Sequence, residues 1–193
     1  MQGPARTELS DEAVLLRPWR LEDVARVTEA CQDPEIPRWT AVIPEPYTEA
    51  DARGFIESTI RAWDEGTGEA SFAIADRADA LVLGAIGLTL QQHFGLQGSI
   101  GYWVASDARG HGVATRALRL VSRWALQELG LPRVQLVTDP ENVPSQRVAE
   151  NAGFTREGLL RRYIETRRGR RDCVMYSLLP DELDPPQAGT PAA

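Results

Sequence analysis

The stretch GYWVASDARGHGVATRAL, residues 101 to 118, constrains the fold of this chain more than any other. A run of strand-forming residues ends at Val104, a polar turn carries Gly110 and Gly112, and an amphipathic helix follows. Glycines at a helix start leave backbone N–H groups exposed at the positive end of the helix dipole, which suits a phosphate or pyrophosphate. A tight turn alone also explains two glycines. In either case the stretch predicts a strand, turn and helix unit.

Apolar spacing predicts the elements on both sides of this unit. The expected strands lie at residues 13–18, 71–76, 81–90, 99–104, 133–139, 155–166 and 173–179. The expected helices lie at 21–31, 48–63, 113–129 and 142–153, with Thr48 and Asn142 as N-caps. Three strands in a row followed by two strand-to-helix units predict a mixed α/β sheet, whose antiparallel half continues into a near-parallel pair. We expect one domain over residues 1–180 and a disordered, acidic and proline-rich tail over 181–193.

Composition narrows the classes of partner. The net charge of −7 argues against general nucleic-acid binding, which needs a basic face. Cys31 and Cys173 stand far apart without metal-ligand spacing, so we expect no disulfide, no metal site and a cytoplasmic setting. The amino terminus lacks a signal-peptide pattern, and no window is apolar enough for a spanning helix, so no membrane association is expected.

Two familiar phosphate loops are disfavoured by the residues present. All 21 basic residues are arginines, which excludes a P-loop lysine and also Schiff-base chemistry. A dinucleotide fingerprint requires a third glycine at position 115, where the chain has Thr115. A nicotinamide-dependent oxidoreductase is therefore a distant alternative.

Two segments resemble one family. Arg109, Gly112 and Ala114 match the Q/R-x-x-G-x-G/A loop of the GNAT superfamily of N-acetyltransferases, and residues 100–118 are similar to its RimJ/RimL-like branch. Asn142-Val-Pro-Ser145, followed by VAENAGF and EGLLR, resembles a second pattern of the same branch. The two matches together span residues 100–162.

The resemblance implies a fold and a cosubstrate site. The fold is a mixed, mostly antiparallel sheet splayed open at its centre and flanked by about four helices, with acetyl-CoA in the gap. The implied contacts to acetyl-CoA come from a strand end, the glycine turn and the start of a second helix. They are Tyr102, Trp103, Val104, Arg109, Gly110, His111, Gly112, Val113, Ala114, Thr115, Asn142 and Ser145. Arg109 either contributes charge or braces the loop.

The same resemblance implies direct acetyl transfer to an amine, without a metal. Ser145 is a candidate donor to the departing sulfur, or only a first-turn capping residue. Ser99 stands where many relatives carry a glutamate, so Tyr163 and Glu165 are candidate catalytic residues by location. Trp39 and Tyr47 are core residues or line the acceptor pocket.

Amine chemistry indicates the acceptor. At pH 7 an α-amine is about a tenth neutral, whereas a lysine amine is neutral in only about one molecule in two thousand. A site without an evident strong base favours the easier amine, so we expect a protein N-terminus of ribosomal-protein type. The alternatives are a small-molecule amine, such as an aminoglycoside or polyamine, and a non-catalytic acyl-CoA-binding module. A homodimer is one expected state, since members of the family often form dimers.

Overall fold

The computed structural model describes residues 3–40, 42–92, 96–166 and 169–183. Its strands, in chain order, are β1 Leu9–Ser10, β2 Val14–Pro18, β3 Glu69–Asp76, β4 Val82–Gln91, β5 Gln97–Val104, β6 Val134–Thr138, β7 Thr155–Thr166 and β8 Gly169–Leu178. Its α-helices are α1 Val24–Ala30, α2 Glu35–Trp39, α3 Glu49–Glu65, α4 Val113–Arg123 and α5 Val143–Asn151. Short 3-10 turns lie at Leu21–Asp23, Ser106–Ala108 and Pro180–Glu182. None of the described helices is long and apolar enough to cross a membrane.

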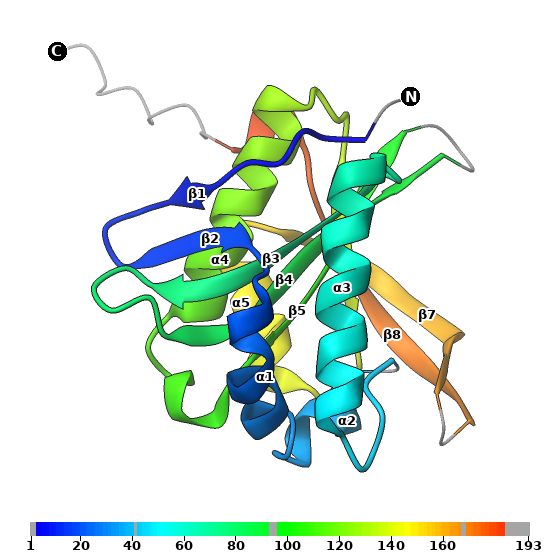
Figure 1. Cartoon of the computed structure of the whole chain (residues 1–193). Coiled ribbons are helices and arrows are strands. Elements are labelled where there is room, and N and C mark those ends of the chain that lie inside the picture. The colour runs from blue at the N-terminus through cyan, green and yellow to red at the C-terminus, as the bar shows by residue number, and fades with distance from the viewer. Residues whose placement is uncertain (1–2, 41, 93–95, 167–168, 184–193) are drawn as a thin grey trace, which may run out of the picture.

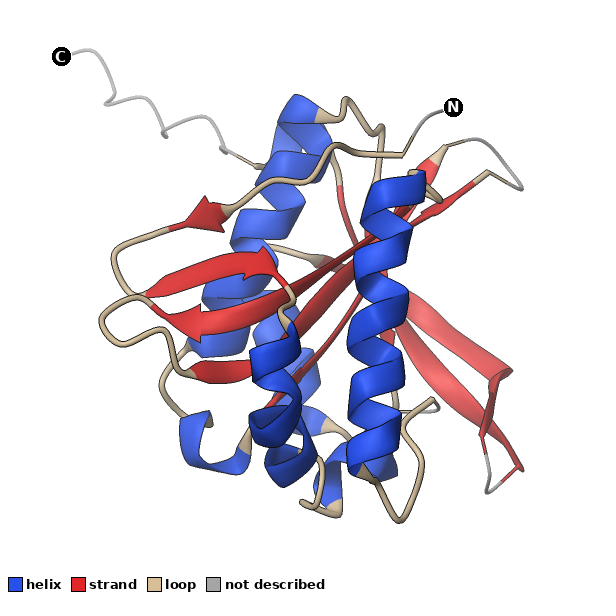
Figure 2. Cartoon of the chain, viewed as in Figure 1, coloured by secondary structure: helices blue, strands red, loops and turns tan. Residues whose placement is uncertain are grey.

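The strands form one sheet in the order β1-β2-β3-β4-β5-β6-β8-β7 (Figures 1 and 2). Every neighbouring pair is antiparallel except β5 and β6, which run parallel. That parallel pairing covers two residue pairs only, Gly98 with Val134 and Ser99 with Gln135. Beyond it the two strands separate, which confirms the mixed sheet opened at its centre.

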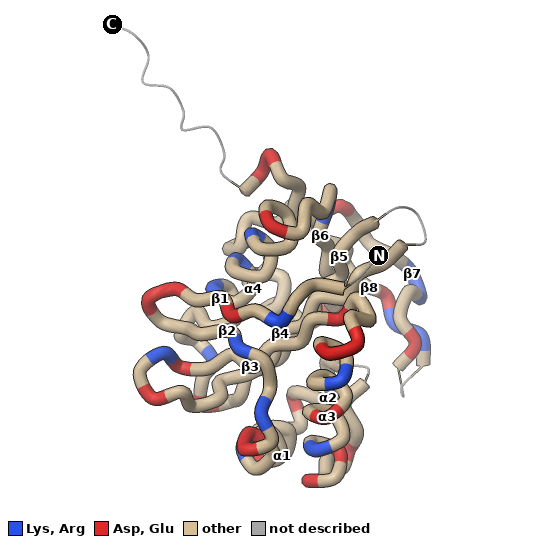
Figure 3. The backbone as a smooth tube through the Cα atoms, turned by 45° about the horizontal axis from the view of Figure 1, so that its top comes forward, with Lys and Arg blue, Asp and Glu red and all other residues tan. Residues whose placement is uncertain are grey.

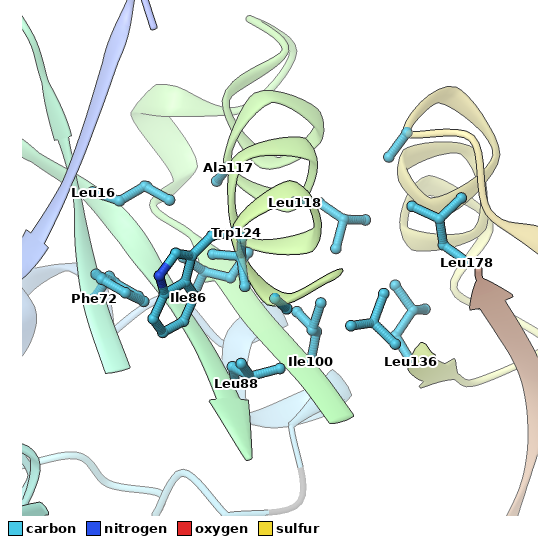
Figure 4. Close-up of a cluster of buried hydrophobic side chains, with 14 of the residues drawn as sticks. Leu16, Phe72, Ile86, Leu88, Ile100, Ala117, Leu118, Trp124, Leu136 and Leu178 are labelled. Atoms are coloured by element: carbon cyan, nitrogen blue, oxygen red, sulfur yellow. The ribbon is translucent and has the colours of Figure 1, made fainter. Parts of the chain in front are cut away.

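Helices cover both faces of the sheet (Figure 1). Helix α4 packs on one face through a cluster that includes Phe72, Ile86, Leu118 and Trp124 (Figure 4). Helices α1 and α3 cover the other face through a second cluster, which includes Val27 and other fully buried apolar residues. The helices on each face pack their apolar side chains against the sheet, so the sheet lies between two helical layers.

The helix signals in the sequence are mostly confirmed. Thr48 caps α3 and forms a capping box with Asp51, and the Asn142 side chain accepts from the Ser145 N–H at the start of α5. Helix α4 is followed by a π-helical turn, Trp124–Glu128. Helix α2 was not predicted, because its sequence EIPRW lies between prolines that read as a loop. Of the expected tail, Pro180–Glu182 forms a turn and residues 184–193 lie outside the described residues.

Candidate functional site

A cavity of about 1000 Å³ opens where β5 and β6 separate. Its wall includes the backbone of β5 from Ser99 to Val104 and the end of β6 from Leu136 to Thr138. Strand edges that lack a neighbouring strand expose N–H and C=O groups, so these two edges can pair with an extended ligand. The predicted contact residues Tyr102, Trp103 and Val104 all line this cavity.

The glycine turn forms one end of the cavity. Gly110 and Gly112 have φ values of +81° and +76°, and Gly112 is the N-cap of α4. A Cβ at either position would meet no protein atom within 4 Å, so the left-handed backbone, and not crowding by the protein, accounts for glycine here. The first N–H groups of a helix have no carbonyl partner within the helix. The open space beside Gly110 and Gly112 therefore fits an anionic group of a ligand.

Two arginines, Arg109 and Arg26, hold the glycine turn in place. The Arg109 Nε donates to the Val104 carbonyl at 3.1 Å, and its Nη2 lies 2.6 Å from Asp33 Oδ2. The Arg26 guanidinium, on α1, donates to the carbonyl of Val82 and to the carboxylate of Asp107. Arg109 thus joins the end of β5 to the segment after α1, and it also lines the cavity.

Helix α5 meets β5 across the cavity wall. The Tyr102 hydroxyl oxygen lies 2.9 Å from Ser145 Oγ and 3.3 Å from the Ser145 carbonyl oxygen. Burial raises the pKa of Tyr102 to about 12, although its hydrogen bond with Ser145 acts in the opposite direction. The Ser145 N–H donates to Asn142 Oδ1 at 3.2 Å. Asn142 and Ser145, two of the expected contacts to acetyl-CoA, both line the cavity, and Ser145 lies in the first turn of α5.

Helix α2 and strand β5 form the other side of the cavity. Trp39 donates through Nε1 to Glu35 at 3.0 Å, and the Arg38 guanidinium stacks 4.4 Å above the Trp39 ring. The hydrogen bonds from Arg38 and Trp39 lower the pKa of Glu35. Ser99 lines the same cavity. Trp39 is therefore placed at the cavity wall, where the acceptor-pocket prediction requires it.

The β7–β8 hairpin adds Arg171 and Cys173 to the cavity lining, two residues that the sequence did not predict to lie at the site. Arg171 lies 2.7 Å from Asp139 Oδ2 and 3.4 Å from Glu141, which ties β8 to the segment that follows β6. Burial is the main cause that raises the pKa of the Cys173 thiol. All four residues line the cavity. In the sequence, Arg171 belongs to the arginine-rich turn RRGRR, and nothing in that run indicates that Arg171 lies in a strand and pairs with Asp139.

Four predicted residues lie elsewhere: Tyr47, His111, Tyr163 and Glu165 do not belong to the described lining of the cavity. Tyr47 is only 8 % exposed and packs in the core between α1 and α3. His111 is exposed at the glycine turn.

Tyr163 and Glu165 alternate along β7 with Ile164 and Thr166, which do line the cavity. Successive side chains of a strand point to opposite faces, so Tyr163 and Glu165 face away from it. Tyr163 is 49 % exposed, and Glu165 pairs with Arg170. A role for these two residues in catalysis would need another arrangement of the hairpin.

Comparison with known proteins agrees with this geometry. A model of the acetyltransferase (GNAT) domain family matches residues 13–155. The uncharacterized N-acetyltransferase p20 of Bacillus licheniformis is 29 % identical over 175 residues, which cover 90 % of this chain and 97 % of that protein. Mycobacterium smegmatis RimJ, solved with CoA-disulfide, has a TM-score of 0.80 at 26 % identity, with 94 % of this chain and 88 % of that chain covered.

A ribosomal-protein-S5-alanine acetyltransferase of Vibrio fischeri shares the fold. Its TM-score is 0.77 at 18 % identity, with 93 % of this chain and 100 % of that chain covered. At that identity the likeness concerns the architecture, namely the sheet and the helices on its two faces.

Proposed function

The chain belongs to the acetyltransferase (GNAT) family, and from this premise we propose that it transfers an acetyl group from acetyl-CoA directly to the α-amine of a protein N-terminus. The activity class, an acetyl-CoA-dependent N-acetyltransferase, follows from the family. One observation carries the proposal: a single cavity connects the glycine turn of α4 with the wall formed by Ser99 and Trp39, through the opening between β5 and β6.

The residues present fit acetyl-CoA. The N-terminal turn of α4 offers free N–H groups and a positive dipole end for the pyrophosphate, with Gly110 and Gly112 leaving the approach open. The unpaired edge of β5 suits the amide groups of the pantetheine arm, which pair with a strand edge as a peptide does. The structure of Mycobacterium smegmatis RimJ with CoA-disulfide supports this assignment.

Three of the four carboxylates in the described lining of the cavity, all except Glu45, are paired with arginines, which supports an acceptor amine that is easy to deprotonate. Glu35 accepts from Arg38, and Asp139 and Glu141 both pair with Arg171. The hydrogen bonds from Arg38 and Trp39 lower the pKa of Glu35, so this carboxylate is a weak base. Ser99 offers no base either. An α-amine, which is about a tenth neutral at pH 7, needs less help than a lysine amine.

Direct transfer needs few groups from the protein. The amine nitrogen bonds to the acetyl carbon, the carbon–sulfur bond breaks with its electron pair on sulfur, and the amine proton passes to water. The protein orients the two reactants and stabilises the charge that develops on oxygen and sulfur. Ser145, at the first turn of α5, is the proposed hydrogen-bond donor to the sulfur.

The charge of the cavity argues against a polycationic small molecule as the main acceptor. The described lining holds as many arginines as carboxylates, namely Arg38, Arg109, Arg147 and Arg171 against Glu35, Glu45, Asp139 and Glu141. A site selected for a polyamine or an aminoglycoside would be expected to carry an excess of negative charge.

An internal competition tests the proposal. A peptide with one free N-terminus and one internal lysine is incubated with acetyl-CoA and the purified chain, and the acetylated nitrogen is located by mass spectrometry. The proposal predicts acetylation of the α-nitrogen, and no product from the same peptide with a blocked N-terminus. Acetylation of the lysine, or turnover with spermidine alone, would overturn it. Binding of acetyl-CoA without turnover on any amine would instead support a non-catalytic module.

A further inference from the structure

Two tyrosine hydroxyls hold helix α5 from the two sides of the opened sheet. Tyr102 of β5 meets Ser145, with 2.9 Å between the two hydroxyl oxygens. Tyr176 of β8 donates to Glu150 Oε1 at 3.1 Å. Both tyrosines therefore anchor the same helix. Of the two, only Tyr102 binds a side-chain hydroxyl that lines the cavity.

Chemistry decides which hydroxyl donates in the pair of Tyr102 and Ser145. The Tyr102 proton has two possible acceptors on Ser145, Oγ at 2.9 Å and the carbonyl oxygen at 3.3 Å, and Oγ is the nearer. A phenol is a stronger acid than an aliphatic alcohol, so the tyrosine is the better donor and the serine oxygen the better acceptor. Burial raises the pKa of Tyr102 to about 12, so the phenol keeps its proton at neutral pH. When Ser145 Oγ accepts from Tyr102, the serine proton remains available for a second partner in the cavity.

The position of Ser145 is fixed from its other side as well. Its N–H donates to the Asn142 side chain at 3.2 Å, in the first turn of α5. The positive end of the helix dipole lies at this turn and favours a negative charge nearby. Tyr102 and Asn142 together hold Ser145 in the first turn of α5, beside the cavity.

We infer that Tyr102 is a positioning residue for acetyl transfer: by donating to Ser145 Oγ, it directs the Ser145 proton to the sulfur that leaves. This inference rests on the proposed function. Ser145 donates a hydrogen bond and keeps its proton, while the electron pair of the broken carbon–sulfur bond stays on sulfur. A thiol with a pKa near 8.5 is a much stronger acid than this phenol, so Tyr102 does not protonate the thiolate.

Steady-state kinetics of four variants separates this role from simple anchoring of α5. Tyr102→Phe and Ser145→Ala should each lower kcat about tenfold to a hundredfold, with the KM for acetyl-CoA within about twofold, because the lost hydrogen bond strengthens as charge develops. The kcat of the double variant should be no lower than that of Ser145→Ala alone, because both substitutions disrupt the same hydrogen bond from Ser145 to the sulfur. Tyr176→Phe, the matched control, removes the other anchor of α5 and should keep kcat within about twofold.

A second readout does not depend on the acceptor. The thiol pKa of bound CoA, followed through the ultraviolet absorbance of the thiolate, should rise by about one unit in Tyr102→Phe and in Ser145→Ala, and stay unchanged in Tyr176→Phe. Equal thiol pKa values in the wild-type chain and in Tyr102→Phe would overturn the inference. So would an equal rise in Tyr176→Phe. If the thiol pKa responds as expected while no peptide is acetylated, the acceptor assignment fails and the role of Tyr102 stands.

Discussion

Arginine side chains shape the cosubstrate site at the scale of single residues. Arg109 and Arg26 bind backbone carbonyls and carboxylates around the glycine turn. Because a guanidinium donates several hydrogen bonds in fixed directions, one arginine can join two segments. The two arginines thereby fix the shape of the turn, where the start of α4 adds positive potential.

One ion pair of this kind makes stability depend on pH. Glu157 of β7 accepts from Arg133 at 2.6 Å and 2.7 Å and from the Ser177 hydroxyl, and the hydrogen bonds from Arg133 are the main cause that lowers its pKa from 4.5 to about 2. A lowered folded-state pKa means that the unfolded chain binds the proton more readily. The stabilisation is therefore complete above pH 4.5 and is lost as the pH falls toward 2.

We predict that Glu157→Gln lowers the free energy of unfolding at neutral pH and flattens its dependence on pH between 4.5 and about 2. Denaturant unfolding at several pH values measures both effects. Glu165→Gln on the same strand is the control, because the Glu165 carboxylate is 75 % exposed and contacts Arg170 at 3.3 Å. Equal pH profiles for the wild-type chain and Glu157→Gln would show that folding does not change the pKa of Glu157.

At the scale of elements, β4 sets the position of the end of β5. Gly84 pairs with Val104, and a Cβ at Gly84 would lie 2.3 Å from the Trp103 carbonyl oxygen and 3.1 Å from the Val104 Cα. Both contacts are to backbone, which cannot rotate away as a side chain does. The end of β5, whose opposite edge faces the cavity, is therefore held close against a residue without a side chain.

Gly84→Ala should consequently move Trp103 and Val104, cost about 1 to 3 kcal/mol of stability, and weaken binding of acetyl-CoA. Gly87→Ala is the matched control on the same strand, since its Cβ would meet its nearest atom at an ordinary 3.7 Å. Thermal unfolding and calorimetric titration with acetyl-CoA measure the two effects. Equal binding by both variants would mean that the end of β5 does not contact the cosubstrate.

Local signals in the sequence predict elements well where one physical cause dominates. Thr48 and Asn142 cap their helices as expected, because a side-chain acceptor at an N-cap satisfies free N–H groups whatever the rest of the fold. Which side chains of β7 point toward the cavity could not be predicted in this way. A bulge between Leu160 and Ile164 resets the alternation, with Arg162 at a φ of +50°. This bulge has no evident signature in the run RRYIET.

At the scale of the whole molecule, the cavity assembles segments that are far apart in the chain. The strand order brings the end of β6 beside β8, so that Asp139 meets Arg171 from 32 residues away. The motifs at residues 109–115 and 142–145 could be identified from the sequence, since each lies within one strand-to-helix connection. Of the side formed by α2, β5 and the β7–β8 hairpin only Trp39 was named from the sequence, because these elements meet only in the folded chain. Charges of both signs are distributed over the outer elements (Figure 3), so charge alone does not mark this side.

Calorimetric titration with acetyl-CoA tests the central claim most directly, using Ala114→Glu as the blocked variant. Ala114 is the second residue of α4 and lines the cavity. A glutamate there suits the helix dipole, so the fold is kept, but it repels a pyrophosphate. Ala50→Glu makes the same change at the second residue of α3, which does not belong to the described lining of the cavity.

The account predicts that the wild-type chain and Ala50→Glu bind acetyl-CoA with a Kd on the order of micromolar, and that Ala114→Glu shows no binding heat while remaining folded. Equal binding by all three chains would contradict it, because the cosubstrate would then lie away from the glycine turn.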